Sequence, residues 1–111
     1  MNSTQRMLPY VRQYVIAAVY DIMDRDGINY KKTDSSTIVA EMSVYGNKSV
    51  FSISVDEQMP GTELTVSMVH PRTGLSVQGV QRAITAVADS IAQYLENELV
   101  INRNVPFRNV L

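Results

Sequence analysis

Three carboxylates near the end of a predicted helix are the first residues whose type and spacing suggest chemistry. Asp21, Asp24 and Asp26 lie close together in the chain. A calcium-binding loop needs alternating oxygen ligands and a glutamate at its twelfth position. The run Asp24-Arg25-Asp26-Gly27 does not supply that spacing. We therefore interpret these acids as the solvated end of a helix, where they face an unfavourable helix dipole.

His70 is the only histidine, and it precedes Pro71 in a predicted loop. A histidine can act as a general base, but the spacing assigns it no nucleophile or acid partner. The chain also lacks cysteine, a phosphate-binding loop, a Gly-x-Ser-x-Gly motif and a paired-histidine metal motif. We therefore expect a non-catalytic protein with no metal or cofactor site, although the tertiary structure can still assemble a site from dispersed side chains.

Length and composition limit the class of protein. The 111 residues fit a single domain, 1–111, and 45% of them are apolar, which favours a globular fold. The net charge of −1 argues against nucleic acid or an anionic membrane as a partner. No apolar run approaches the roughly 20 residues that span a bilayer, and no signal peptide is evident. The absence of cysteine is compatible with a reducing compartment, and we expect a cytoplasmic protein.

Residues 37–70 are predicted to form a three-stranded antiparallel meander around which the rest is organised. Gly46 and Asn47 both tolerate positive φ, so they are predicted as the two-residue loop of the first hairpin. This loop sets a register with apolar pairs Met42–Phe51, Ala40–Ile53 and Ile38–Val55.

The third strand alternates in the same way, with Leu64, Val66 and Met68 on one face. Pro60 and Gly61 suit the central positions of a type II turn leading into it. Residues 28–32 are interpreted either as a short fourth strand, which would place Tyr30 opposite Val39, or as a loop.

A helix is predicted on each side of the meander. The first has an apolar stripe from Leu8 to Ile22, a cap at Ser3 or Thr4, and a stop at Gly27. The second begins after Ser76 and runs to about residue 99. Its wide apolar stripe favours core packing over the alternative of a coiled-coil seam.

These elements predict an α+β fold of order α-β-β-β-α, a two-layer sandwich with both helices on one face of the sheet. The predicted core consists of Leu8, Val11, Val15, Ile22, Ile38, Met42, Phe51, Ile53, Val55, Leu64, Val66, Met68, Val80, Ile84, Val87, Ile91 and Leu95. Residues 100–111 are interpreted as a tail that docks on its own domain or on a neighbouring chain.

The succession of helix, three strands and helix over residues 8–99 resembles the start of the type III secretion chaperone-like fold. The resemblance lies in the order of elements and in no sequence motif. It implies a small dimeric protein of the kind that family contains, with a chaperone-like role as one alternative function.

The other face of the predicted sheet has mainly small or β-branched side chains and few charges, a composition suited to close contact with a protein. We therefore expect an interaction or assembly module that forms a homo-oligomer or binds another protein. An alternative is a small-ligand carrier with a pocket near Met42, Phe51, Met68 and Tyr94. The predicted partner-binding residues are Val39, Ser43, Tyr45, Val50, Ser52, Ser54, Thr65, Ser67, Val69 and Phe107.

Overall fold

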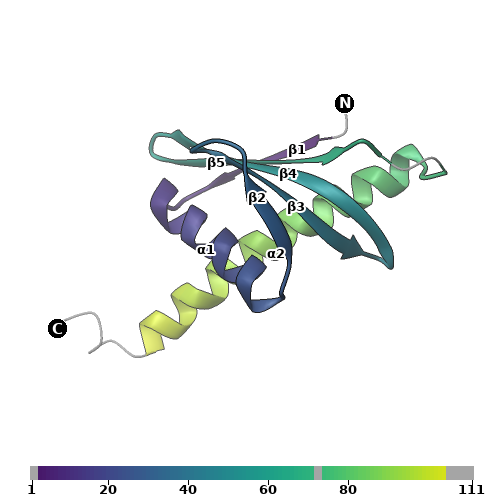
Figure 1. Cartoon of the computed structure of the whole chain (residues 1–111). Coiled ribbons are helices and arrows are strands. Elements are labelled where there is room, and N and C mark those ends of the chain that lie inside the picture. The colour runs from purple at the N-terminus through teal and green to yellow at the C-terminus, as the bar shows by residue number, and fades with distance from the viewer. Residues whose placement is uncertain (1–2, 72–73, 105–111) are drawn as a thin grey trace.

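The computed structural model describes residues 3–71 and 74–104, with side-chain burial described as far as residue 98. Along the chain the elements are β1 (Ser3–Leu8), α1 (Arg12–Arg25), β2 (Asn29–Lys32), β3 (Thr37–Val44), β4 (Asn47–Gln58), β5 (Gly61–Val69) and α2 (Val77–Asn104). The fold is α+β, as predicted. Its order is β-α-β-β-β-β-α, with five strands in place of the three or four expected (Figure 1).

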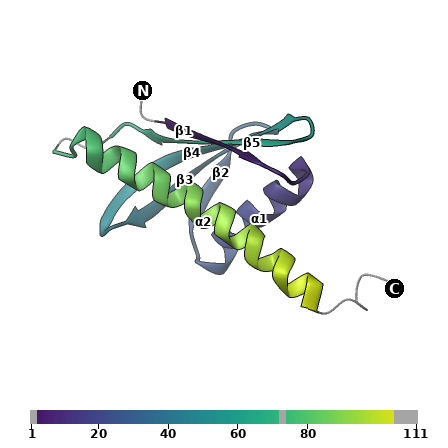
Figure 2. The same cartoon turned by 180° about the vertical axis from the view of Figure 1, so that it is seen from behind.

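The strands form one antiparallel sheet in the order β1-β5-β4-β3-β2. Figures 1 and 2 show α1 and α2 on the same side of this sheet, so the molecule has two layers. Helix α2 crosses beneath the sheet, and its C-terminal part extends past α1 and away from the strands.

The N-terminal segment corrects the first prediction. Ser3 and Thr4 are not helix caps, because they begin β1, which pairs with β5. Helix α1 starts only at Arg12, after an N-cap residue Val11 that is 68% exposed and so does not belong to the core. Strand β1 pairs with the edge of β5 that would otherwise have unpaired backbone N–H and C=O groups. Leu8, at the end of β1, is buried in the core.

The β3–β4 hairpin closes one residue earlier than predicted. Its loop is Tyr45-Gly46, with φ of 52° and 80°. A two-residue type I′ turn requires positive φ at both of these positions. The register therefore shifts by two residues, and Ala40 lies opposite Phe51 in place of Ile53. A two-residue shift keeps every side chain on its predicted face. It also sets the largest core residue across from a small one.

The next turn also differs from the prediction. Strands β4 and β5 are joined by Met59 and Pro60, whose connecting peptide bond is cis, and Gly61 is already the first residue of β5. A Cβ on Gly61 would collide with the carbonyl oxygen of Leu8. This glycine is therefore required for the close approach of β1, and it does not serve as the second turn residue.

The fourth strand predicted at 28–32 is present as β2, but its register differs by one residue. Tyr30 lies opposite Ala40, where the prediction placed it opposite Val39. Because a one-residue shift moves a side chain to the other face, Tyr30 lies on the helix side. Its ring centroid is 5.6 Å from that of Tyr20, and its hydroxyl donates to Asp24 at 3.2 Å.

All predicted core residues are buried except Val11 and Met42, and Met42 is half-buried. The prediction missed Met23, which is 1% exposed. It also missed Thr62, a fully buried polar residue whose hydroxyl donates to the carbonyl oxygen of Tyr10 at 2.6 Å. This bond satisfies a buried hydroxyl and ties β5 to the segment between β1 and α1.

The helix ends match the sequence signals more closely. Gly27 has φ of 65° just beyond α1, and the backbone N–H of Gly79 donates to Ser76 Oγ at 2.9 Å at the start of α2. Helix α2 continues to Asn104, so residues 100–104 of the predicted tail are helical. Residues 105–111, including Phe107, lie outside the described residues.

The element order also bears on the resemblance to secretion chaperones. That resemblance depended on a helix followed by three strands and a second helix. The described chain instead begins with a strand and places four strands between its two helices. The pattern that supported the analogy is therefore wrong.

Candidate interaction surface

The sheet face opposite the helices is here called the outer face. Neither α1 nor α2 covers it (Figures 1 and 2). The strand registers assign to it Ser3, Gln5, Met7, Asn29, Lys31, Thr37, Val39, Glu41, Ser43, Lys48, Val50, Ser52, Ser54, Asp56, Glu63, Thr65, Ser67 and Val69.

The centre of the outer face consists of small side chains. One row crosses all five strands through Ser3, Ser67, Ser52, Val39 and Lys31. Only the residue at the β2 edge of this row is charged. In the adjacent row, the hydroxyls of Thr37 and Ser54 are 3.0 Å apart and form a hydrogen bond across the strands. Such short side chains make a flat surface that a second backbone layer can approach closely.

Apart from Lys31 at the β2 edge, the charges on the outer face lie toward the two ends of the strands. Lys48 Nζ is 3.9 Å from Glu41 Oε1 at one end, and both side chains are largely exposed, so this pair contributes little to stability. At the other end Asp56 lies directly opposite Glu63 in the register. Like charges in this position repel. Among the described residues no salt bridge reaches either acid.

The predicted partner-binding residues mostly gather on this face. Its strands contain Val39, Ser43, Val50, Ser52, Ser54, Thr65, Ser67 and Val69. Tyr45 is an exception, because it sits in the hairpin turn and lines hollows together with Arg82 of α2. Phe107 is outside the described residues.

Sequence reasoning missed the part of the outer face that β1 and β2 contribute. The prediction has a helix capped at Ser3 or Thr4, where β1 instead presents Ser3, Gln5 and Met7, and it gives the strand that contains Lys31 the wrong register. The one local signal was Pro9, which is compatible with the end of a strand as well as with the first turn of a helix.

A groove of about 610 Å³ lies between the end of α1, the middle of α2 and the hairpin end of β3, and it also reaches the outer-face residues Glu41, Ser43 and Lys48. Its apolar lining includes Ile22, Met23, Met42, Val87 and Ile91, and its polar lining includes Asp26, Glu41 and Lys48. This volume lies in the range of small-molecule sites.

The four residues proposed to line a ligand pocket do not converge. Only Met42 lines the groove. Phe51 is fully buried in the core, Met68 borders a separate hollow of about 150 Å³, and Tyr94 borders a shallow one beside Arg25.

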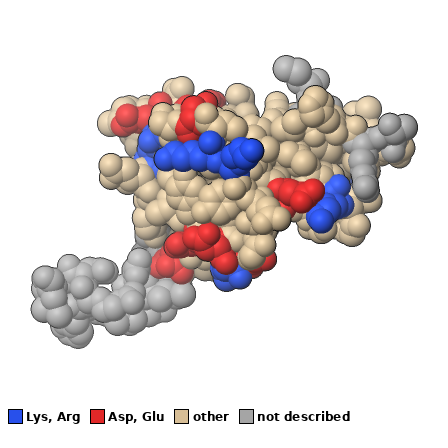
Figure 3. Space-filling view, viewed as in Figure 1, with Lys and Arg blue, Asp and Glu red and all other residues tan. Residues whose placement is uncertain are grey.

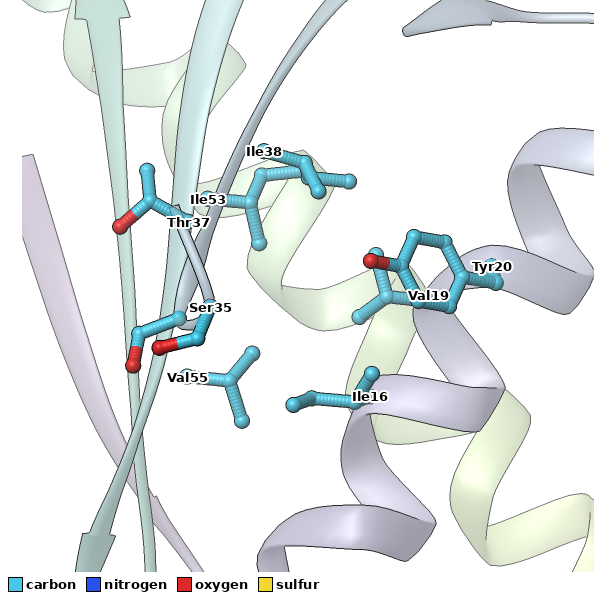
Figure 4. Close-up of a pocket in the computed structure, with 9 residues that line it drawn as sticks. Ile16, Val19, Tyr20, Ser35, Thr37, Ile38, Ile53 and Val55 are labelled. Atoms are coloured by element: carbon cyan, nitrogen blue, oxygen red, sulfur yellow. The ribbon is translucent and has the colours of Figure 1, made fainter. Parts of the chain in front are cut away.

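A further cavity lies between α1 and the β3–β4 pair (Figure 4). Ile16 and Val19 of α1 point toward Val55 and Ile53 of the sheet, and the Tyr20 hydroxyl is directed toward the same side. Its volume is only about 10 Å³, which is at most the room for one water molecule. This cavity is a small packing gap with no space for a ligand.

The acids at the end of α1 act as hydrogen-bond and ion-pair acceptors. Tyr94 donates its hydroxyl to Asp21 at 3.3 Å, and Arg25 Nε donates to Asp26 at 3.0 Å. Burial raises the pKa of Tyr94, and the carboxylate of Asp21 raises it further. In the described part of the chain, no three potential metal-ligating side chains come together.

Among the described residues, His70 belongs to no group of three or more potential metal-ligating side chains. It is exposed at the end of β5 and adopts φ of 50° just before Pro71.

The charge distribution is mixed. Figure 3 shows small groups of both signs separated by wide uncharged areas on the face in view.

No helix in the described ranges combines the length and hydropathy needed to cross a bilayer. Comparison with known proteins found no matching family model and no matching curated protein.

Proposed function

We propose that the chain is a non-catalytic protein-interaction module that contacts its partner through the outer face. The observation that supports this proposal is the five-stranded sheet, whose outer face neither described helix covers and whose central rows are almost free of charge. A sheet face that remains in water usually carries polar side chains, long charged ones among them. Here Ser52 and Ser54 occupy the middle of the central strand β4, and Thr65 and Ser67 the middle of the neighbouring β5.

Lysine substitution provides the test. Ser52→Lys combined with Thr65→Lys places two ammonium groups where a partner surface would have to remove their water. The fold should tolerate both changes, because neither side chain points toward the helices. A matched control is Gln13→Lys combined with Gln81→Lys, which adds the same charge at exposed positions on α1 and α2.

Sedimentation velocity over a concentration series is the first measurement, followed by capture, identification and reconstitution with any purified partner. The proposal predicts complexes that the outer-face variant loses and the control retains. If the wild type forms no complex, or if both variants bind equally well, the outer face is not an interaction surface.

A second candidate function, small-ligand binding, is favoured by the groove beside α2. Its lining combines apolar side chains such as Met23, Met42 and Ile91 with polar and charged ones, and its volume suits a small molecule. Filling the groove by Ala86→Trp should abolish saturable binding of a neutral fluorescent naphthylamine probe. Gln93→Trp, at an exposed position outside the groove, is the control. Equal probe binding by both variants would exclude the groove.

A further inference from the structure

Strand β4 presents opposite charges at the two ends of its outer face. Its outward residues run Lys48, Val50, Ser52, Ser54, Asp56, so a base and an acid each stand four residues from the central serine. At a rise of about 3.3 Å per residue, each charge is roughly 13 Å from Ser52. A surface with this arrangement is complementary to a reversed copy of itself.

We propose that the partner of the outer face is a second copy of this chain, packed face to face around a two-fold axis that crosses the strands at the row of Ser52. This inference rests on the proposed function and specifies its partner. A two-fold contact places the same patch on both subunits. About such an axis each strand lies over its own copy in the reverse direction, so Lys48 of each protomer meets Asp56 of the other.

The alternative two-fold axis, which runs along the strands, is disfavoured by charge. Taken along β4, it would set Asp56 over its own copy. The neighbouring Glu63 would add to the repulsion among desolvated carboxylates. The axis across the strands avoids this repulsion. It brings Glu63 of one protomer over a point beyond the C-terminal end of β5 in the other protomer, where no acid of that strand lies. Lys31 then meets its own copy only at the β2 rim, where water screens the charges.

The dimensions also suit such a dimer. Aligned sheets cross at about 30°, which displaces points 13 Å from the axis by roughly 6 Å, a gap that a lysine side chain spans. The five strands cover a flat area of about 600 Å² from their lengths and spacing. A standard interface uses about 800 Å² of accessible surface per partner, and accessible surface exceeds its flat projection.

Charge reversal and its rescue test the geometry in the full chain. Lys48→Glu and Asp56→Lys should each weaken dimerisation about tenfold or more, because each brings like charges together twice. The double variant Lys48→Glu/Asp56→Lys should recover dimerisation to within about threefold of the wild type. Glu57→Lys is the control, because it is exposed next to Asp56 on β4 but points to the opposite side.

Equilibrium sedimentation separates the outcomes. Loss in both single variants together with recovery in the double variant supports the inference. A dimer that is unaffected by either single variant, or that the double variant fails to restore, overturns it. If Ser52→Lys/Thr65→Lys still disrupts that dimer, the outer face remains the interaction surface in another arrangement. A monomeric wild type overturns the inference. In that case the interaction function is still supported if a different purified protein binds the wild type but does not bind Ser52→Lys/Thr65→Lys.

Discussion

Arg12 Nε donates a hydrogen bond to the carbonyl oxygen of Val55 at 3.0 Å, which joins the first turn of α1 to the middle of the sheet. The same guanidinium donates through Nη2 to the carbonyl oxygen of Ser35 at 2.6 Å and to Ser36 Oγ at 3.1 Å. One side chain thus connects three segments that are distant in sequence. A planar guanidinium can do this because its donors point in fixed directions.

Removing this connection should destabilise the domain. We expect Arg12→Ala to lower the free energy of unfolding by about 1–3 kcal/mol, because hydrogen bonds to charged groups are lost and backbone acceptors are left unpaired. Arg12→Lys should recover only part of the loss. Urea titration measures the effect. Arg25→Ala is the control. Arg25 is largely exposed, bonds to exposed Asp26 and lies 5.5 Å from the centroid of the Tyr94 ring, so its loss should change stability far less. Similar losses at both arginines would contradict the role assigned to Arg12.

Ile53 of β4 and Ile84 of α2 both belong to the hydrophobic core. Ile53 is 1% exposed and Ile84 is fully buried. Ile53→Ala and Ile84→Ala should each cost about 2–5 kcal/mol, because each loses buried apolar surface and leaves a cavity. Val77, which is 78% exposed at the start of α2, provides the control substitution Val77→Ala. Denaturant midpoints that shift no more for the two isoleucines than for this valine would be inconsistent with the packing described.

The β3–β4 turn contains a strained residue that substitution can relieve. Tyr45 has φ of 52°, a conformation that asparagine tolerates better than tyrosine. Tyr45→Asn should therefore stabilise the protein by about 0.5–1 kcal/mol, because it creates an Asn-Gly turn. Thermal unfolding can measure this. Asn47→Gly distinguishes the two registers. It should be neutral or destabilising in the observed register, because Asn47 already belongs to β4, whereas stabilisation would favour a Gly46-Asn47 loop.

Stability should fall at alkaline pH because of Tyr94. Its pKa is raised in the folded state by burial and by Asp21, whereas in the unfolded chain it is near the ordinary value of about 10. The folded state therefore holds the phenolic proton more tightly. The stability it contributes is fully present below pH of about 10 and is lost as pH rises through the folded pKa.

Urea titrations at intervals between about pH 8 and 11 test this effect. Tyr94→Phe should reduce the alkaline decline, and Asp21→Asn should reduce it to a smaller extent. The remainder comes from Tyr30, whose pKa is also raised by burial and by Asp24. If the decline keeps the same slope in Tyr94→Phe, Tyr94 is not its source.

Much of the sheet could be predicted because side-chain alternation is a local property. Ile53, Val55, Leu64 and Val66 point inward in any register that preserves the period of two, so the two faces follow from the chain alone. The apolar stripe of α2 and its cap at Ser76 are equally local. The same alternation placed Ser52 and Thr65 on the outer face before any tertiary contact was known.

The tertiary structure decided what depends on partners distant in sequence. Residues 3–8 form a strand because β5, some sixty residues later, offers an unpaired edge. The hairpin closes at Tyr45-Gly46 because that register seats Phe51 opposite Ala40, although the local turn chemistry prefers asparagine. The complementary placement of Lys48 and Asp56 on either side of Ser52 likewise depends on the assembled sheet. Only the tertiary structure shows that this face is not covered by α1 or α2. Local sequence sets the face on which a side chain lies, whereas strand pairing and register depend on the combined packing of the whole domain.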